Sequence, residues 1–142
     1  MYKSQFFFLS LSILFSFAGC GGTTVSGVVK YSDGTPLHLG TVMAESDKDS
    51  LYGAIDKDGH FVLGKLKPGD SVPVGTYTVW ITDTTELTAV REERIVDGHD
   101  ASSETRTSTQ HIAAKYRSKG DSPLTLEIKP GKQTHNITVE KP

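Results

Sequence analysis

The sequence predicts an all-β fold, a seven-stranded antiparallel β-sandwich with Ig-like topology and a long polar loop. From residue 24 onward, apolar and polar residues alternate with a period of two, which is typical of strands with one buried face. Turn residues, mainly Gly, Pro and Asp, interrupt the alternation at short intervals. Helical periodicity is weak throughout, so strands must supply the core.

The first strand and its turn are expected between residues 25 and 36. Val25, Gly27 and alternate residues after them share one face, and SDGTP follows. The pair Asp33-Gly34 suits a tight turn, because glycine tolerates positive φ and aspartate bonds its own backbone. Pro36 fixes φ just after this turn. The pair Asp58-Gly59 predicts a second tight turn for the same reason, so Gly27, Gly34, Pro36 and Gly59 are assigned structural roles.

Six further strands are expected at 40–46, 51–55, 60–64, 75–82, 124–129 and 134–140. In the segment 75–82, Tyr77 lies on the apolar face and predicts a tyrosine corner, with the ring buried and the hydroxyl bonded to the backbone upstream. Trp80 falls on the polar face of the same strand. Either the insertion at 83–111 covers this indole or the ring is available to a ligand; we favour covering.

The insertion at 83–111 divides into two parts. The segment 84–96, TTELTAVREERIV, contains many helix formers but has a poor helical stripe, so helix and strand both stay open. The segment 97–111 has almost nothing apolar to bury and is expected to be a mobile loop.

The N-terminus predicts export and a lipid anchor. In the segment 1–19, Lys3 precedes an apolar run that is short and interrupted by serines, as in a signal peptide rather than a spanning helix. Phe17-Ala18-Gly19-Cys20 resembles the bacterial lipobox, although leucine is usual where Phe17 stands. The alternatives are that Cys20 ends an ordinary signal or is a free thiol; being the sole cysteine, it has no disulfide partner within the chain.

Lipidation of Cys20 gives a simple domain plan. Residues 20–23 would form the lipidated terminus and short tether, and residues 24–140 would form one β-sandwich domain. The protein would then be held on the periplasmic or cell-surface side of a membrane. The formal net charge of −2 and the absence of a basic run argue against a nucleic-acid partner.

Several motifs carry a family resemblance. VSGVVKYSDGTPLHLGTVMAES resembles the opening of the carboxypeptidase regulatory-like, or transthyretin-like (prealbumin-like), domain, and GAIDKDGHFVLGKLKPGDSVPVGTYTVWI continues the match. The segment IAAKYRSKGDSPLTLEIKPGK is similar to small lipoproteins of the planctomycete type. The resemblance implies an exported, lipid-anchored β-sandwich with no established activity.

Catalytic and metal chemistry find weak support in the sequence. Asp56 and Asp58 are weak calcium candidates, but DKDG lacks the further ligands of a calcium loop and predicts a plain hairpin turn. The histidines have no zinc-type spacing, so a zinc site would need distant loops, and surface histidines are the simpler expectation. We therefore expect no metal and no cofactor.

An enzyme is not expected either. The transthyretin fold does host a hydrolase with a Tyr-Arg-Gly-Ser terminus, and KYRSKG at 115–120 is superficially similar. This segment is internal and has no glycine before its serine, so a transthyretin-fold hydrolase is a remote alternative.

The functional expectation is a lipid-anchored structural or binding module of the cell envelope. The alternative is a carbohydrate- or protein-binding accessory domain whose ligand surface includes Trp80, Lys115, Tyr116 and Arg117. The expected partners are the membrane, through the lipid, and an envelope protein or glycan.

Overall fold

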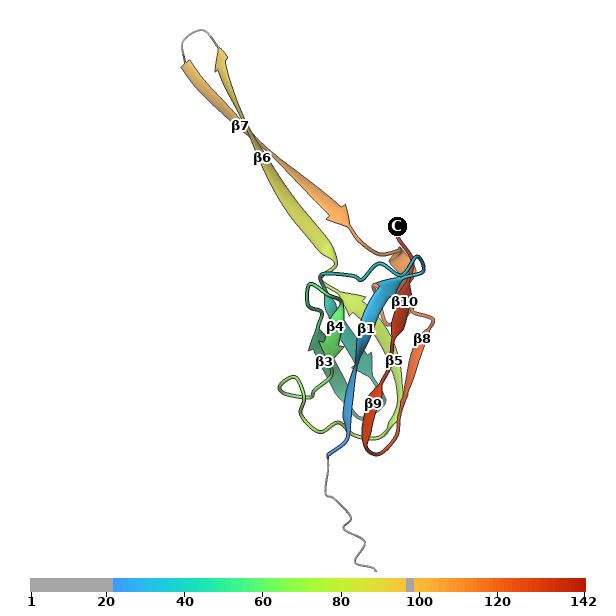
Figure 1. The fold of residues 1–142 in the computed structure, drawn as a ribbon. Coiled ribbons are helices and arrows are strands. Elements are labelled where there is room, and N and C mark those ends of the chain that lie inside the picture. The colour runs from blue at the N-terminus through green and yellow to red at the C-terminus, as the bar shows by residue number, and fades with distance from the viewer. Residues whose placement is uncertain (1–21, 97–98) are drawn as a thin grey trace, which may run out of the picture.

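The computed structural model describes residues 22–96 and 99–142, which form strands joined by turns and one short 3-10 helix (Figure 1). The elements in chain order are β1 (Thr24–Tyr31), β2 (Thr41–Glu45), β3 (Ser50–Ala54), β4 (His60–Val62), β5 (Gly75–Thr82), β6 (Thr85–Val96), β7 (His99–Gln110), η1 (Ala114–Tyr116), β8 (Leu124–Ile128), β9 (Lys132–Thr134) and β10 (Ile137–Val139).

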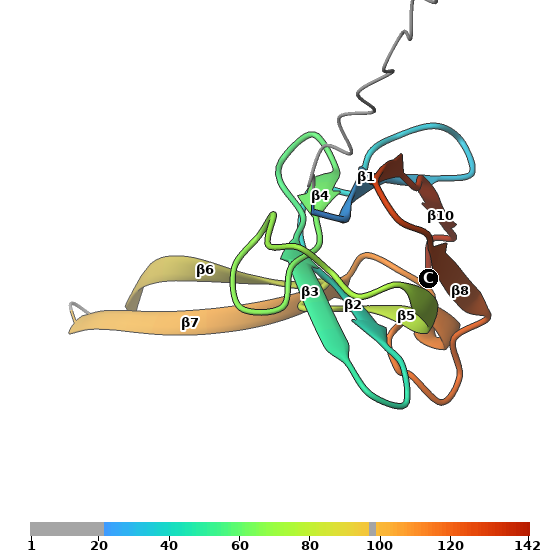
Figure 2. The same ribbon diagram turned by 90° about the horizontal axis from the view of Figure 1, so that it is seen from below.

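Two four-stranded sheets pack face to face, which confirms the predicted all-β sandwich (Figure 2). One sheet has the order β10-β1-β4, with β9 also paired to β1, and the other has the order β3-β2-β5-β8. Two details of the prediction are wrong. The two sheets hold four strands each, one strand more in total than the predicted seven. The pairing is also not antiparallel throughout, because β1 pairs in parallel with both β9 and β10.

The additional strand arises because the predicted strand 134–140 is broken in two. The break falls at His135 and Asn136, between β9 and β10. The His135 N–H donates to the Ser26 carbonyl (2.8 Å), while the Asn136 side-chain oxygen accepts the Val28 N–H (3.2 Å). Both groups therefore bond to β1 outside the regular ladder, and the register is the same on either side of the break, because Ser26 pairs with Thr134 and Val29 with Ile137.

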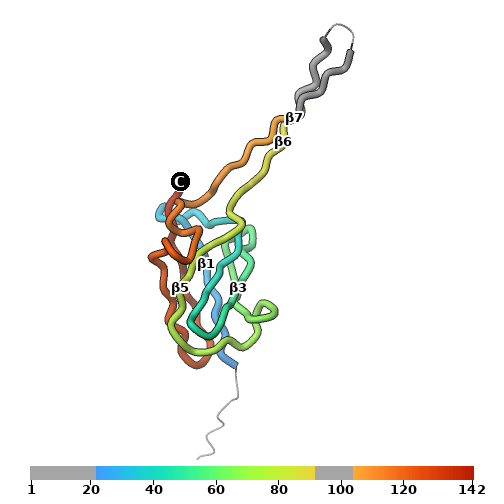
Figure 3. The backbone as a smooth tube through the Cα atoms, turned by 180° about the vertical axis from the view of Figure 1, so that it is seen from behind, coloured from blue at the N-terminus to red at the C-terminus, as the bar shows by residue number. Residues whose placement is uncertain are grey.

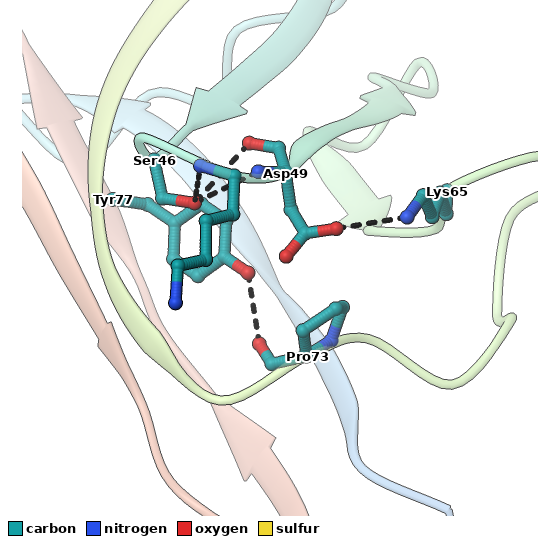
Figure 4. A network of polar contacts seen from close by, with 6 residues as sticks. Ser46, Asp49, Lys65, Pro73 and Tyr77 are labelled. Atoms are coloured by element: carbon teal, nitrogen blue, oxygen red, sulfur yellow. Dashed lines mark hydrogen bonds and ion pairs between the residues drawn. The ribbon is translucent and has the colours of Figure 1, made fainter.

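The core lies between the two sheets and is built from the alternating apolar residues. Tyr77 on β5 is 1% exposed, and its hydroxyl donates to the Pro73 carbonyl (2.9 Å), which confirms the tyrosine corner (Figure 4). Burial raises the pKa of this hydroxyl. The other fully enclosed side chains include Val25, Val29, Leu37, Val42, Leu51, Leu63, Val79, Ile81, Ile112 and Val139.

The β2–β3 turn packs beside this corner and is held by side-chain contacts (Figure 4). Ser46 Oγ accepts the Asp49 N–H (3.0 Å), which closes the turn. Asp49 Oδ1 in turn accepts a hydrogen bond from Lys65 Nζ (2.8 Å). That hydrogen bond raises the pKa of Lys65 and ties the turn to the connection between β4 and β5.

The residues predicted to shape the turns occupy sites that require them. A Cβ on Gly27 would lie 1.8 Å from the His135 carbonyl oxygen, so β1 can approach β9 only with glycine there. Gly59 has a φ of 84°, and a Cβ there would meet the Val29 carbonyl oxygen at 2.6 Å. In the turn that contains Gly34, Asp33 Oδ1 accepts the Thr35 N–H (2.9 Å). Pro36 then forms an isolated antiparallel β-bridge with Lys30 on β1.

The insertion forms a long antiparallel hairpin, β6–β7, that projects from one end of the sandwich (Figures 1 and 3). The open choice for residues 84–96 is resolved as strand, because β6 covers Thr85–Val96. The prediction of a loop at 97–111 is wrong, because residues 99–110 form β7 and pair with β6 along its length. Among the described residues, the structure contains no helix with the length and hydropathy needed to cross a membrane.

Candidate functional site

The outer face of the β3-β2-β5-β8 sheet carries a row of three large side chains. Tyr52 on β3 lies opposite Met43 on β2, and Met43 lies opposite Trp80 on β5. Directly opposed residues of antiparallel strands have Cβ atoms about 5 Å apart, so these side chains are immediate neighbours. The strands thus bring together Tyr52, Met43 and Trp80, which we call the aromatic row.

The aromatic row is accessible to solvent. Tyr52 is 37% exposed, and its hydroxyl donates to the Leu66 carbonyl (2.6 Å), which fixes the ring in place. Trp80 and Met43 are half-buried. The expectation that the insertion covers Trp80 is wrong, because β6–β7 leaves the end of β5 and points away from the sheet (Figures 1 and 2).

A polar groove of about 360 Å³ lies on the same face, beside the aromatic row. Glu45 and Thr78 line it, and they are the next outward-facing residues after Met43 and Trp80 on their strands. Lys119 closes one side through a 2.7 Å ion pair between its Nζ and Glu45 Oε1. The remaining lining residues are Ser46, Asp47, Lys48, Asp49, Val74, Gly75 and Thr76. The aromatic row and this groove together form the outer-face site.

The other predicted ligand residues do not line this groove, and one of them is buried. Lys115 and Tyr116 belong to η1, whose neighbour Ala113 bonds the backbone just after β10, in the opposite sheet. Tyr116 is 6% exposed, so its assignment to a ligand surface is wrong. Lys115 Nζ pairs with Glu140 Oε2 (2.8 Å), and this hydrogen bond raises the pKa of Lys115. Arg117 is exposed but does not line the groove, although Lys119, two residues later, does.

Asp56 and Asp58 form a cluster with His60 in the β3–β4 turn. The Asp56 carboxylate, however, is already engaged by backbone N–H groups of the turn. Asp56 Oδ1 accepts the N–H groups of Asp58 (2.8 Å) and His60 (2.9 Å). The hydrogen bond from His60 is the principal cause of the lowered pKa of Asp56. This geometry is that of the tight hairpin turn that the sequence predicts.

A second cluster joins residues that the sequence analysis left unconnected. His38, Glu86 and His111 place their ligand atoms within 4.8 Å of one another. His38 lies between β1 and β2, Glu86 on β6, and His111 directly after β7. Local spacing carries no signal for this cluster, because three separate segments supply its members.

Comparisons with known proteins give little guidance. No family model matches the chain, and no curated protein matches it. One solved structure that resembles it is a Pseudomonas aeruginosa protein described as a candidate carbohydrate-binding protein. The two are 12% identical, the match covers 83% of this chain and 88% of the other, and the TM-score is 0.38. A TM-score this low does not assign the ligand of one protein to the other.

Proposed function

We propose that this protein is a lipid-anchored, non-catalytic binding module of the cell envelope, of the carboxypeptidase regulatory-like type, and that its outer-face site binds a carbohydrate. The resemblance of Phe17-Ala18-Gly19-Cys20 to a lipobox supports the anchor; this segment lies outside the described residues. The single observation that supports the ligand class is the accessible aromatic row beside a polar groove.

The chemistry of this face suits a sugar. One side of a pyranose ring presents polarised C–H groups, which pack against the negative faces of aromatic rings such as Trp80 and Tyr52. The sugar hydroxyls need donors and acceptors, and Glu45, Thr78 and Lys119 supply both within the groove. Because the Tyr52 hydroxyl is already bonded to the Leu66 carbonyl, the platform is held before a ligand arrives.

A glycan array tests this proposal, with the mature chain carrying Cys20→Ala for solubility. We expect Trp80→Ala to weaken binding of any captured glycan at least about tenfold, the loss of roughly one buried aromatic contact. Val62→Ala is the matched control, because Val62 is 38% exposed on the other sheet. Absence of glycan binding, or equal losses in the two variants, would overturn the carbohydrate assignment.

The anchor is tested separately. Wild-type protein should partition into the detergent phase and carry an acyl mass increase on its N-terminal peptide, whereas Cys20→Ala should show neither, because two or three acyl chains bind a bilayer firmly. Equal partitioning of the two proteins would remove the anchor and leave the glycan result unaffected.

The hairpin favours a second candidate function, binding of an envelope protein. Strands β6 and β7 pair with each other, and within the described residues neither has a second partner strand. An open strand edge can accept an extended segment of another protein through backbone hydrogen bonds. Crosslinking in envelopes would distinguish the two functions: shortening the hairpin should abolish a protein adduct, while Trp80→Ala should preserve it.

A further inference from the structure

The cluster at the base of the hairpin has the composition of a transition-metal site. His111 Nε2 lies 3.2 Å from Glu86 Oε2, and the rings of His38 and His111 meet edge to face with centroids 5.1 Å apart. Two imidazoles and a carboxylate are a ligand set that zinc prefers, whereas calcium and magnesium prefer oxygen ligands throughout. We propose that His38, Glu86 and His111 bind a divalent transition-metal ion of the zinc type.

The distances are close to those that a bound ion needs. Zinc ligands at about 2.1 Å in a tetrahedral arrangement are separated from one another by about 3.4 Å. The Glu86–His111 pair already has this separation, and all three ligand atoms lie within 4.8 Å. His38 and Glu86 are exposed, so rotation of their side chains can supply the remaining movement. The same exposure leaves a fourth coordination position open to water.

The backbone beneath the cluster is fixed, so the ligands are brought together before metal arrives. The His111 N–H donates to the Thr84 carbonyl (3.1 Å), and the His111 carbonyl accepts the Tyr31 hydroxyl (2.9 Å). His38 follows the fully buried Leu37, whose N–H bonds the Val29 carbonyl (3.0 Å). Tyr31, Val29 and Leu37 belong to the sandwich, whereas the bond between Thr84 and His111 lies at the base of the hairpin, directly before β6 and after β7.

A bound ion would join the hairpin to the sandwich. Glu86 belongs to the hairpin and His111 follows its second strand, whereas His38 belongs to the sandwich, which we also call the body. Coordination would therefore add a link between the two parts at the point where the hairpin leaves the body. The inference is independent of the proposed carbohydrate site, because the two sites share no residue.

Zinc titration of tag-free protein, with a chromophoric chelator as competitor, tests the site. We expect one zinc ion per chain, and His38→Ala or Glu86→Gln should each weaken the affinity at least about tenfold. His60→Ala is the matched control, because His60 sits in the other histidine-containing cluster, and it should stay within twofold of wild type. Bound Co²⁺ should give the visible absorption of a tetrahedral site.

Hydrogen exchange supplies a second readout, because zinc should slow exchange of the amides near residues 85–87 and 108–110 in wild type but not in His38→Ala. Circular dichroism of the variants checks that both remain folded; His38 and Glu86 are exposed, so we expect no change. Failure to bind zinc at micromolar concentration, or wild-type affinity in His38→Ala, would overturn the proposal. Loss of binding in His60→Ala alone would place the metal in the β3–β4 turn and also overturn it.

Discussion

The sandwich and the hairpin are both built from β-strands, yet they are stabilised by different interactions. Strands β1, β2, β3 and β5 of the sandwich bury alternate side chains between the two sheets, so residues such as Val25 and Val29 are fully enclosed. In β6 the described side chains, from Thr85 to Arg91, are exposed on both faces, and they include Leu87 (74% exposed) and Val90 (50% exposed). The comparison shows that backbone pairing alone can define a strand, while burial is what makes a strand contribute substantially to stability.

The largest expected effect is the loss of a core side chain from the body. Tyr77→Ala should lower the free energy of unfolding by about 3–5 kcal/mol, because a buried ring and its hydrogen bond to Pro73 disappear. Urea denaturation measures this loss. Tyr77→Phe keeps the ring and should cost about 1 kcal/mol. Similar small losses in both variants would show that the corner is not part of the packed core.

A steric change in the body should rank next. Gly27→Ala places a methyl group within 1.8 Å of the His135 carbonyl oxygen, so the β1–β9 pairing must shift, at a cost of about 1–3 kcal/mol. Gly120→Ala is the control, since nothing lies within 4 Å of a Cβ there. The same urea experiment compares the two, and equal stabilities would contradict the close approach.

Shortening the hairpin should have a smaller effect. Replacing residues 88–107 with an Asn-Gly turn keeps the Leu87–Ser108 pair and the metal ligand Glu86. The described side chains of this stretch, at 88–91 and 104–107, are exposed, and loop-closure entropy varies slowly with length, so the free energy of unfolding should change by less than about 1 kcal/mol. A loss of several kcal/mol would mean that the hairpin packs on the body.

The smallest expected effect is on an exposed ion pair of the body. Lys141 Nζ bonds Asp33 Oδ2 (2.9 Å), and this hydrogen bond is the main reason that the pKa of Asp33 lies well below its usual range. A lowered folded-state pKa stabilises the fold above about pH 4, and that contribution is lost as the pH falls further. In Asp33→Asn, the free energy of unfolding should therefore fall slightly less steeply than in wild type as the pH is lowered below about 4. An unchanged curve would show that solvent screens the pair completely.

The same contrast explains what the sequence could reveal. Strand β5 was predicted with its observed bounds, 75–82, because Tyr77, Val79 and Ile81 alternate with polar residues. Strand β7, HDASSETRTSTQ, has no apolar face, so the pattern indicated a loop. Its pairing with β6 follows from cross-strand hydrogen bonds and the preference of threonine for extended backbone, neither of which produces a hydrophobic period.

The candidate sites were predictable in part. Trp80 was identified because it interrupts a polar face, but its neighbours Met43 and Tyr52 depend on the register of three strands. Tyr116 was misassigned because an aromatic residue between Lys115 and Arg117 resembles a surface cluster, whereas the chain turns its ring into the core. The cluster of His38, Glu86 and His111 depends entirely on tertiary structure.

The direction of the hairpin has a consequence for reach. β1 begins at the end of the sandwich opposite the hairpin (Figures 1 and 3). With a lipid on Cys20, few residues separate the bilayer from Thr24, so the lower end of the body would rest close to the headgroups. The 12 residues of β6, at about 3.3 Å each, extend about 40 Å beyond the opposite end. The hairpin would then project away from the membrane and hold the open edges of β6 and β7 at a distance from the headgroups.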